Sequence, residues 1–510
     1  MKKNVLALSI TAALVGFGFA SGAHANGTGA TATALELSPS GIGHMLLVPY
    51  YSAQSNNATL INIVNTDTVN GKAVKVRFRG AANSDDVFDF QVFLSPGDAW
   101  SANVSKGADG RATLTTNDNS CTKPAKSVLN SNGFVTARLD SKLTGDALAN
   151  QTREGYVEIF NMADIQPATV AADSGALFTA IKHVSSVPPC SGTAWTDLDS
   201  LATSDQHLAP PTGTLLADWI IINTVDAGAW SGQATAVMAV SGAAGAVAAG
   251  AGNQVYWPQM ATTIGSTTAA SYTADPLMQG TAPIVQPSLY DLPDMSTPYV
   301  SGANGASPTA QAKALSTSIA TNSITNEFLT NPAIHATTDW TISMPTRRYS
   351  VALNYNTTLG TAVYNTGLTE FFTSANTSVV ARQICVSPLA SSAWDQEENQ
   401  PAPGGVVISP SPIVPGVPFC GEVGVLSINN GGVGASGTLK ATVARADLTY
   451  AALPTAGWIT ISTPNATTVA NPLTSDVGLP VVGSAFVRAT AATGTFGVTW
   501  DHHGSRLNLQ

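Results

Sequence analysis

Alternation of apolar and polar residues between positions 72 and 94 is the feature that most limits how this chain can fold. Three short apolar-rich runs lie at 60–64, 72–79 and 87–94, and in the second and third runs apolar side chains recur at every second position. In the second run the positions between them are basic, namely Lys75, Arg77 and Arg79. Because successive side chains of a strand point to opposite faces, each run predicts a β-strand with one dry face and one wet face.

Turn signals separate these runs. Asn70-Gly71 predicts a tight turn before the second run. Residues 95–98 (SPGD) predict another after the third run, since proline presets the second turn position and glycine tolerates positive φ at the next. Trp100 then begins a further short strand. We therefore expect an antiparallel meander whose apolar face packs against a second sheet.

The first residues carry the pattern of an export signal. Met1-Lys2-Lys3 precedes an apolar run over 5–20, and Ala23-His24-Ala25 matches a small-residue cleavage site. We expect residues 1–25 to be a secretory signal peptide and the mature chain to begin at Asn26. The apolar run is short and small residues follow it, which argues against a membrane anchor. The expected location is therefore extracellular.

Charge is scarce in this chain, and its balance is acidic. Charged residues make up 11% of the sequence, against about 25% in typical globular domains. The formal net charge is −10, and no basic stripe is present, which argues against a nucleic-acid partner. Small neutral residues fill the remaining positions, as suits a large β protein with long neutral loops.

These patterns predict an all-β fold, made of antiparallel, immunoglobulin-like β-sandwich domains with long loops and one or two inserted helices. We expect residues 26–240 to form an N-terminal β-sandwich region and residues 331–510 a C-terminal β-rich region. Residues 241–330 between them combine a low-complexity loop with a helix. The helix is expected over 309–329, because apolar residues there keep helical spacing behind a Ser307-Pro308 cap.

Four cysteines are present, an even number that favours disulfides in an exported chain. Three connectivities are open, and we favour the sequential pairs Cys121–Cys190 and Cys385–Cys420. Each bond would close a long loop and add about 4 kcal/mol of stability in the chain-entropy account. The alternative is a metal site, but the sequence has no C-x-x-C spacing and few histidines.

Catalytic motifs are missing from the sequence. It contains no H-E-x-x-H, G-x-S-x-G, P-loop or dinucleotide fingerprint, so we do not expect an enzyme. Calcium, which takes oxygen ligands from loops, is the expected cofactor. The loops that hold Asp118 and the group Asp395, Glu397 and Glu398 are its candidate sites. The alternative for each of these clusters is solvated surface charge.

Several segments in order along the chain resemble a family of secreted proteobacterial cell-surface proteins, similar to surface-layer proteins of marine gammaproteobacteria. These segments span most of the mature chain and are residues 45–51 (MLLVPYY), 73–79 (AVKVRFR), 94–100 (LSPGDAW), 153–159 (REGYVEI), 338–340 (TDW) with 345–349 (PTRRY), and 394–399 (WDQEEN). The resemblance implies a self-assembling coat on the outer membrane of a Gram-negative bacterium, and it implies no catalytic motif.

Two functions therefore stand as hypotheses. The first is a structural protein that forms a surface-layer lattice, whose partners are further copies of the chain and an outer-membrane lipid or polysaccharide. The second is a monomeric surface adhesin or carbohydrate-binding protein, since exposed aromatic side chains bind sugars and nine tryptophans are present. The number of copies on the cell surface distinguishes the two.

Overall fold

Strands make up most of the regular structure, and the predicted all-β sandwich fold is confirmed. The computed structural model describes residues 29–170, 175–241, 248–259, 271–280, 283–285, 290–400, 416–429, 435–450, 453–466, 478–491 and 494–505. The predicted signal peptide, residues 1–25, lies outside the described residues. Within the described ranges, no helix combines the length and the apolar character that crossing a bilayer requires.

The N-terminal lobe is a sandwich of two antiparallel sheets. The larger sheet has the order β1 (Ala34–Leu37), β12 (Thr235–Ser241), β2 (Met45–Ser52), β9 (Glu154–Ile165), β4 (Gly71–Gly80), β5 (Asp86–Leu94) and β8 (Cys121–Lys123), with β13 (Ala248–Ala249) on β12. The smaller sheet has the order β11 (Gly228–Gln233), β10 (Leu215–Asn223), β3 (Asn57–Asn65), β6 (Ala99–Lys106) and β7 (Ala112–Thr115). Apolar side chains of both sheets share one buried core.

The predicted meander is wrong in its pairing. Strands β4 and β5 do form a hairpin, but β3 and β6 pair with each other in the opposite sheet. The turn at Asn70-Gly71 therefore carries the chain from one sheet to the other. Alternation marks the dry face of each strand, and it does not say whether two dry faces lie side by side in one sheet or opposite each other across a core.

The expected wet face of β4 is also wrong. Lys75 and Arg77 are each 1% exposed, and Arg79 is 4% exposed. The segments 253–259 and 290–299 cover this face of the larger sheet: the side-chain amide of Gln91 donates to the carbonyl of Trp257, and Arg77 donates to two carbonyls of the second segment. Both faces of the sheet are therefore buried, one under apolar contacts and the other under polar contacts.

The C-terminal lobe is a second sandwich. Its first sheet has the order β19 (Thr377–Val380), β20 (Gln383–Trp394), β24 (Ala456–Ser462), β15 (Ser323–Leu329) and β28 (His503–Ser505), with β21 (Gly416–Cys420) on β20. Its second sheet has the order β23 (Arg445–Leu448), β22 (Val423–Ile428), β16 (Thr337–Ser343), β26 (Ser484–Ala491) and β27 (Gly494–Asp501). Two short ladders pair β14 (Ala320–Thr321) with β25 (Leu479–Pro480) and β17 (Val351–Asn354) with β18 (Thr361–Tyr364).

Helices are short and lie in the connections. The described residues include α1 (Lys126–Ser131), α2 (Gly145–Asn150), α3 (Gly175–Ile181), α4 (Thr193–Asp197), α5 (Leu201–Ser204), α6 (Pro308–Ile319) and α7 (Arg347–Ser350), with single 3-10 turns η1 (Asp205–His207), η3 (Pro276–Met278), η5 (Ala303–Gly305) and η6 (Pro332–Ile334). The predicted cap on α6 is confirmed, since Ser307 Oγ accepts from the amide of Ala310.

The predicted end of that helix at position 329 is wrong. Helix α6 ends at Ile319, and residues 323–329 form strand β15, which pairs with β24. Ile324 and Phe328 are four positions apart, a spacing that fits a helix and a strand equally well. The C-terminal sheets therefore begin before the expected boundary at 331.

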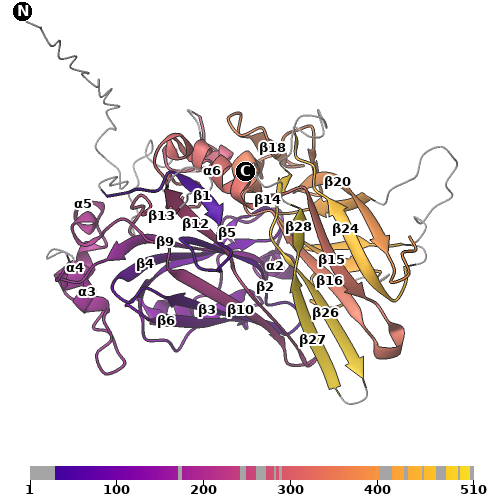
Figure 1. The fold of residues 1–510 in the computed structure, drawn as a ribbon, viewed down its shortest axis with the longest axis horizontal. Coiled ribbons are helices and arrows are strands. Elements are labelled where there is room, and N and C mark those ends of the chain that lie inside the picture. The colour runs from indigo at the N-terminus through magenta and orange to yellow at the C-terminus, as the bar shows by residue number, and fades with distance from the viewer. Residues whose placement is uncertain are drawn as a thin grey trace, which may run out of the picture.

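The two lobes lie side by side (Figure 1) and are joined through β11 and β27 at one side. The indole nitrogen of Trp230 on β11 donates to the carbonyl of Val487 at 2.9 Å. A β-carbon at Gly497 would lie 2.2 Å from the carbonyl oxygen of Ala229, so this close approach of β27 to β11 requires glycine. One apolar core also continues from Phe160 in the first lobe to Trp340 in the second.

Both predicted disulfides are present. Cys121–Cys190 ties β8 to the loop after α3, and Cys385–Cys420 joins directly opposed residues of β20 and β21. The first bond spans 69 residues and the second 35. Each therefore constrains a long loop in the unfolded chain.

Replacing Cys121 and Cys190 together with alanine should lower the free energy of unfolding by about 4 kcal/mol, because the unfolded chain regains the entropy of a long loop. Denaturant unfolding of the wild type and the double variant under non-reducing conditions measures this difference. Equal stability of the two proteins would contradict it.

Candidate functional site

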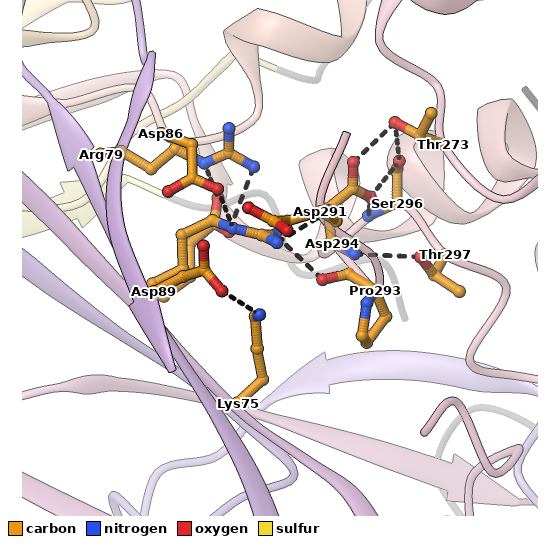
Figure 2. A network of polar contacts seen from close by, with 12 residues as sticks. Lys75, Arg79, Asp86, Asp89, Thr273, Asp291, Pro293, Asp294, Ser296 and Thr297 are labelled. Atoms are coloured by element: carbon orange, nitrogen blue, oxygen red, sulfur yellow. Dashed lines mark hydrogen bonds and ion pairs between the residues drawn. The ribbon is translucent and has the colours of Figure 1, made fainter. Parts of the chain in front are cut away.

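The basic side chains of β4 belong to a buried ionic network (Figure 2). Arg77 Nε donates to Asp86 Oδ2 at 2.8 Å, and Arg79 Nε donates to Glu158 Oε1 at 3.1 Å. Lys75 pairs with Asp89. The acceptors come from β5 and β9, the two strands that flank β4 in the sheet, so the sheet itself sets the spacing of these ion pairs.

A segment from the middle of the chain closes over this network. Arg77 Nη1 donates to the carbonyl of Pro293 at 2.9 Å, and Nη2 donates to that of Asp291 at 2.8 Å. Asp294 fixes the shape of the segment, since it accepts from Ser296 Oγ and from Thr273 Oγ1, both at 2.6 Å. Residues about 200 positions apart in the chain are held together by these contacts.

Three carboxylates meet where the segment reaches the sheet. Among the described residues, Asp86, Asp89 and Asp291 form the one group whose ligand atoms all lie within 4.8 Å of one another. They open onto a cavity of about 370 Å³, whose wall includes Phe88 and Arg138. At this cluster, three carboxylates and an arginine line one cavity.

The cluster does not fit a divalent cation, because its charges are already balanced. Arg138 Nη1 lies 3.1 Å from Asp86 Oδ2, and its Nη2 lies 3.0 Å from Asp291 Oδ2. Arg77 shares Asp86, and Lys75 holds Asp89. Calcium takes six to eight oxygen ligands, whereas these oxygens face three cationic side chains. The arrangement is an ion-pair network.

Proton affinity differs sharply within the cluster. Burial and the nearby charge of Asp89 together raise the pKa of Asp291 to about 7, against the opposing pull of Arg138. Burial acts to raise the pKa of Asp89, but Lys75, a hydrogen bond with Asp291 and the charge of Arg77 together outweigh it and hold this pKa well below the ordinary value. At neutral pH, Asp89 is ionised and Asp291 is close to its titration midpoint.

Asp291 should make stability depend on pH near neutrality. Its pKa is higher in the folded state than the ordinary 3.8, so the folded protein binds this proton more tightly than the unfolded chain does. The stabilisation is therefore fully present below about pH 4 and is lost as pH rises through about 7. Asp291→Asn removes this group, and its free energy of unfolding should fall less than that of the wild type between about pH 5.5 and 8.

Denaturant unfolding at a series of pH values measures the effect. The control is Asp447→Asn, which removes a carboxylate that is 47% exposed and should leave the wild-type pH profile unchanged. Parallel profiles for the wild type and Asp291→Asn would contradict a titrating Asp291.

A second buried network joins the two lobes. Arg348 of α7 contacts Asp275 Oδ2 at 2.9 Å and Asp85 Oδ1 at 3.1 Å, and it also donates to the carbonyl of Asn83. Its neighbour Arg347 pairs with Glu422 Oε2 at 2.8 Å. The short helix α7 thereby contacts the β4–β5 hairpin through Asp85, the middle of the chain through Asp275, and the residue before β22 through Glu422.

Buried carboxylates fix a further loop to both lobes. Asp339 on β16 accepts from the amides of Thr438 and Leu439 at 2.9 and 2.7 Å. Glu154 on β9 accepts from the amides of Thr442 and Ala444 at 2.7 and 3.0 Å. Burial raises the pKa of both acids, and these donors oppose the shift. Residues 438–444 therefore link the two sandwiches through two separate acceptors.

Replacing Arg348 with methionine should destabilise the protein by about 3–5 kcal/mol, because Asp85 and Asp275 would stay buried without their cation. The control is Lys313→Met at the solvent-exposed pair with Glu370, which should change stability by less than about 1 kcal/mol. Denaturant unfolding compares the two. Equal effects would show that the Arg348 network contributes no more than a surface pair.

The residues predicted to hold calcium are not brought together as a preformed site. Asp118 accepts from the amide and hydroxyl of Ser120 at 2.8 and 2.6 Å. Asp395 accepts from the amides of Glu397 and Asn399 at 2.9 and 2.7 Å, within an exposed turn. Glu397 and Glu398 are exposed on the same turn. Among the described residues, none of these four acids belongs to a cluster of three ligand atoms.

The buried ion-pair networks were not predicted from the sequence, although the spacing of basic residues along β4 indicates them. Three of the 22 basic residues alternate along one strand of a charge-poor chain. Surface charge placed for solubility would be spread more evenly, so this concentration indicates paired burial. The acceptors are harder to find, because Asp275 and Asp291 lie far along the chain from that strand.

Comparisons with models of protein families, with curated proteins and with solved structures found no match for this chain.

Proposed function

We propose that this chain is a structural protein of the bacterial cell surface, which assembles with further copies of itself into a two-dimensional layer on the outer membrane. The observation that carries the proposal is the placement of charge. Among the described residues, eighteen acidic or basic residues are buried, in a chain that has 22 basic and 32 acidic residues. Such residues are almost never fully buried unless they are paired. The surface is left rich in neutral side chains.

A neutral surface suits repeated contacts between identical, acidic copies. Loss of Lys2 and Lys3 with the signal peptide takes the net charge from −10 to −12 (−10 − 2) in the mature chain. This charge opposes close packing, and the repulsion is smallest where few charges lie at the contact. Salt screens exposed charges that lie more than about 8 Å apart at physiological ionic strength. Contacts made by Ser, Thr and Asn side chains and by the backbone at Gly avoid close pairs of like charge altogether.

Rigidity is the second property that supports a layer. Open assemblies grow through heterologous contacts that do not close into a ring, and a regular array requires each copy to present its contacts at constant angles. The Arg348 network and the 438–444 loop join the lobes through buried contacts. A hinge between the lobes would have to separate buried charges, which costs several kcal/mol.

Calcium enters the proposal as a bridge between copies. Glu397 and Glu398 project from an exposed turn at the end of β20, where they are accessible to a second copy or to an anionic lipid head group. A shared cation would draw its oxygen ligands from both partners. This arrangement needs no preformed site within one copy.

The mature chain, residues 26–510, should form ordered sheets after dialysis, and calcium should promote them because it neutralises carboxylates that would otherwise repel. Electron microscopy and light scattering with calcium, and with a chelator, measure assembly. Glu397→Gln with Glu398→Gln should reduce the calcium dependence, while Asp447→Asn serves as the surface control. Folded monomers at every calcium concentration would contradict the layer and favour a monomeric adhesin. Equal assembly with and without the chelator would contradict a role for calcium in the layer.

A further inference from the structure

Two tryptophans of the C-terminal lobe differ from most others in the chain. Trp100, Trp219, Trp230, Trp257 and Trp340 are all fully buried in the cores. Trp458 is 39% exposed, and Trp394 is half-buried. Their rings stack with centroids 3.9 Å apart and planes 12° apart. Core packing, which explains the buried tryptophans, does not explain an indole pair that faces solvent.

The strand register places this pair on the outer face of the first C-terminal sheet. Trp394 on β20 lies opposite Trp458 on β24, which in turn lies opposite Glu327 on β15. The neighbouring positions Ala393 and Ile459 are buried, so the side chains at alternate positions point outward. The three strands are neighbours in the sheet and lie side by side in Figure 1.

A row of hydroxyl groups runs beside the indoles. Ser392, Thr460 and Thr325 occupy the next outward positions on the same three strands, about 7 Å along each strand. Thr325 Oγ1 donates to Thr460 Oγ1 at 2.9 Å. Glu327 is exposed at the end of the tryptophan row. The surface thus carries an aromatic platform, made of the outer faces and edges of a stacked indole pair whose facing surfaces cover each other, beside hydroxyl and carboxylate groups at fixed spacing.

We propose that this platform of Trp394, Trp458 and Glu327, with its row of hydroxyls, binds a neutral glycan. The aromatic faces present an apolar, electron-rich surface to the C–H groups of a sugar ring, and the carboxylate and hydroxyls accept and donate hydrogen bonds to sugar hydroxyls. This pairing of apolar faces with a few placed polar groups is typical of small-molecule sites.

The chemistry of the face selects against other partners. A nucleic-acid strand would need basic groups along its backbone as well as stacking surfaces, whereas the described residues of these two rows on β15, β20 and β24 include no Lys or Arg, and the hydroxyl row continues only to His503, opposite Thr325 on β28. An acidic polysaccharide would be repelled by Glu327 and by the carboxylates of the 395–399 turn that follows Trp394. A helical peptide would need a continuous apolar groove, but hydroxyls occupy the second row. A glycan without charge meets none of these obstacles.

The backbone around Trp394 and Trp458 orders the platform before a ligand binds. A β-carbon at Gly457 would lie 2.0 Å from the carbonyl oxygen of Trp394, so glycine allows the end of β20 to approach β24 beside the stack. Asp395 then accepts two backbone amides of its own turn, which orders the chain directly after Trp394. Groups that are fixed beforehand lose less entropy on binding. The glycan platform does not depend on assembly into a layer.

Affinity electrophoresis of the mature chain tests the proposal. The neutral probes are soluble β-1,4-glucan, β-1,3-glucan, α-1,4-glucan and mannan, and dextran sulfate is the anionic probe. We expect at least one neutral polysaccharide to retard the wild type and dextran sulfate not to retard it. Trp458→Ala should weaken the retardation about tenfold, because the variant loses the more exposed indole of the stacked pair. Trp458→Phe, which keeps an aromatic face, should retain part of the binding.

The matched control is Phe496→Ala, which removes a side chain that is 60% exposed on the other sheet and should leave retardation unchanged. Circular dichroism and thermal unfolding verify that each variant is folded. If Trp458→Ala does not fold, Trp458→Phe and Glu327→Ala test the proposal instead, and both should weaken retardation. Failure of every neutral probe to retard the wild type overturns the proposal. Retardation that these substitutions leave unchanged also overturns the proposal. If the substitutions reduce assembly and leave retardation unchanged, the platform is a contact between copies.

Discussion

Burial of paired charge is the interaction on which the rest of this structure depends. Removing an ion from water costs several kcal/mol even after relaxation, and a pair recovers this only with good geometry and further hydrogen bonds. Arg77, Arg79, Arg347 and Arg348 all meet that condition, since each contacts a carboxylate and at least one backbone carbonyl or second carboxylate. Of these four arginines, Arg348 is the one whose described carboxylate partners include a residue of the other lobe, so a misplaced lobe would break the pair of Arg348 with Asp85, and this pair favours one arrangement of the two sandwiches.

The segments that carry the resemblance to cell-surface proteins are largely the segments that build these networks. AVKVRFR supplies the cations of β4, REGYVEI supplies Glu154 and Glu158, TDW supplies Asp339, and PTRRY supplies the arginines of α7. The charged side chains of these segments therefore hold the fold together through buried ion pairs and hydrogen bonds. WDQEEN is different, because it lies at the surface and contains Trp394 and the exposed carboxylates.

Moving charge inward has a consequence for the outside of the molecule. A chain with few charged residues that buries many of them presents neutral side chains to its surroundings, and such a surface suits both proposals made for it. Neutral contacts between copies support a layer, and an aromatic platform among hydroxyls supports a glycan ligand. The carboxylates of the 395–399 turn lie beside the platform, so calcium between copies and a glycan on the sheet would act at neighbouring positions.

The sequence by itself determined the strands of the first hairpin, the dry face of each and the cap of α6, and it favoured the pairing of the cysteines that the structure shows. These follow from local properties: side-chain period, turn residues and chain entropy. Only the tertiary structure decided that β3 and β4 lie in opposite sheets, that the basic face of β4 is buried, and that residues 323–329 form a strand. It also brought Asp291 to Asp89 and Trp394 to Trp458. Alternation reports that one face of a strand is polar, but whether water or a paired carboxylate covers that face depends on residues hundreds of positions away. Long-range partners of this kind leave no periodic trace in the segment that they complete.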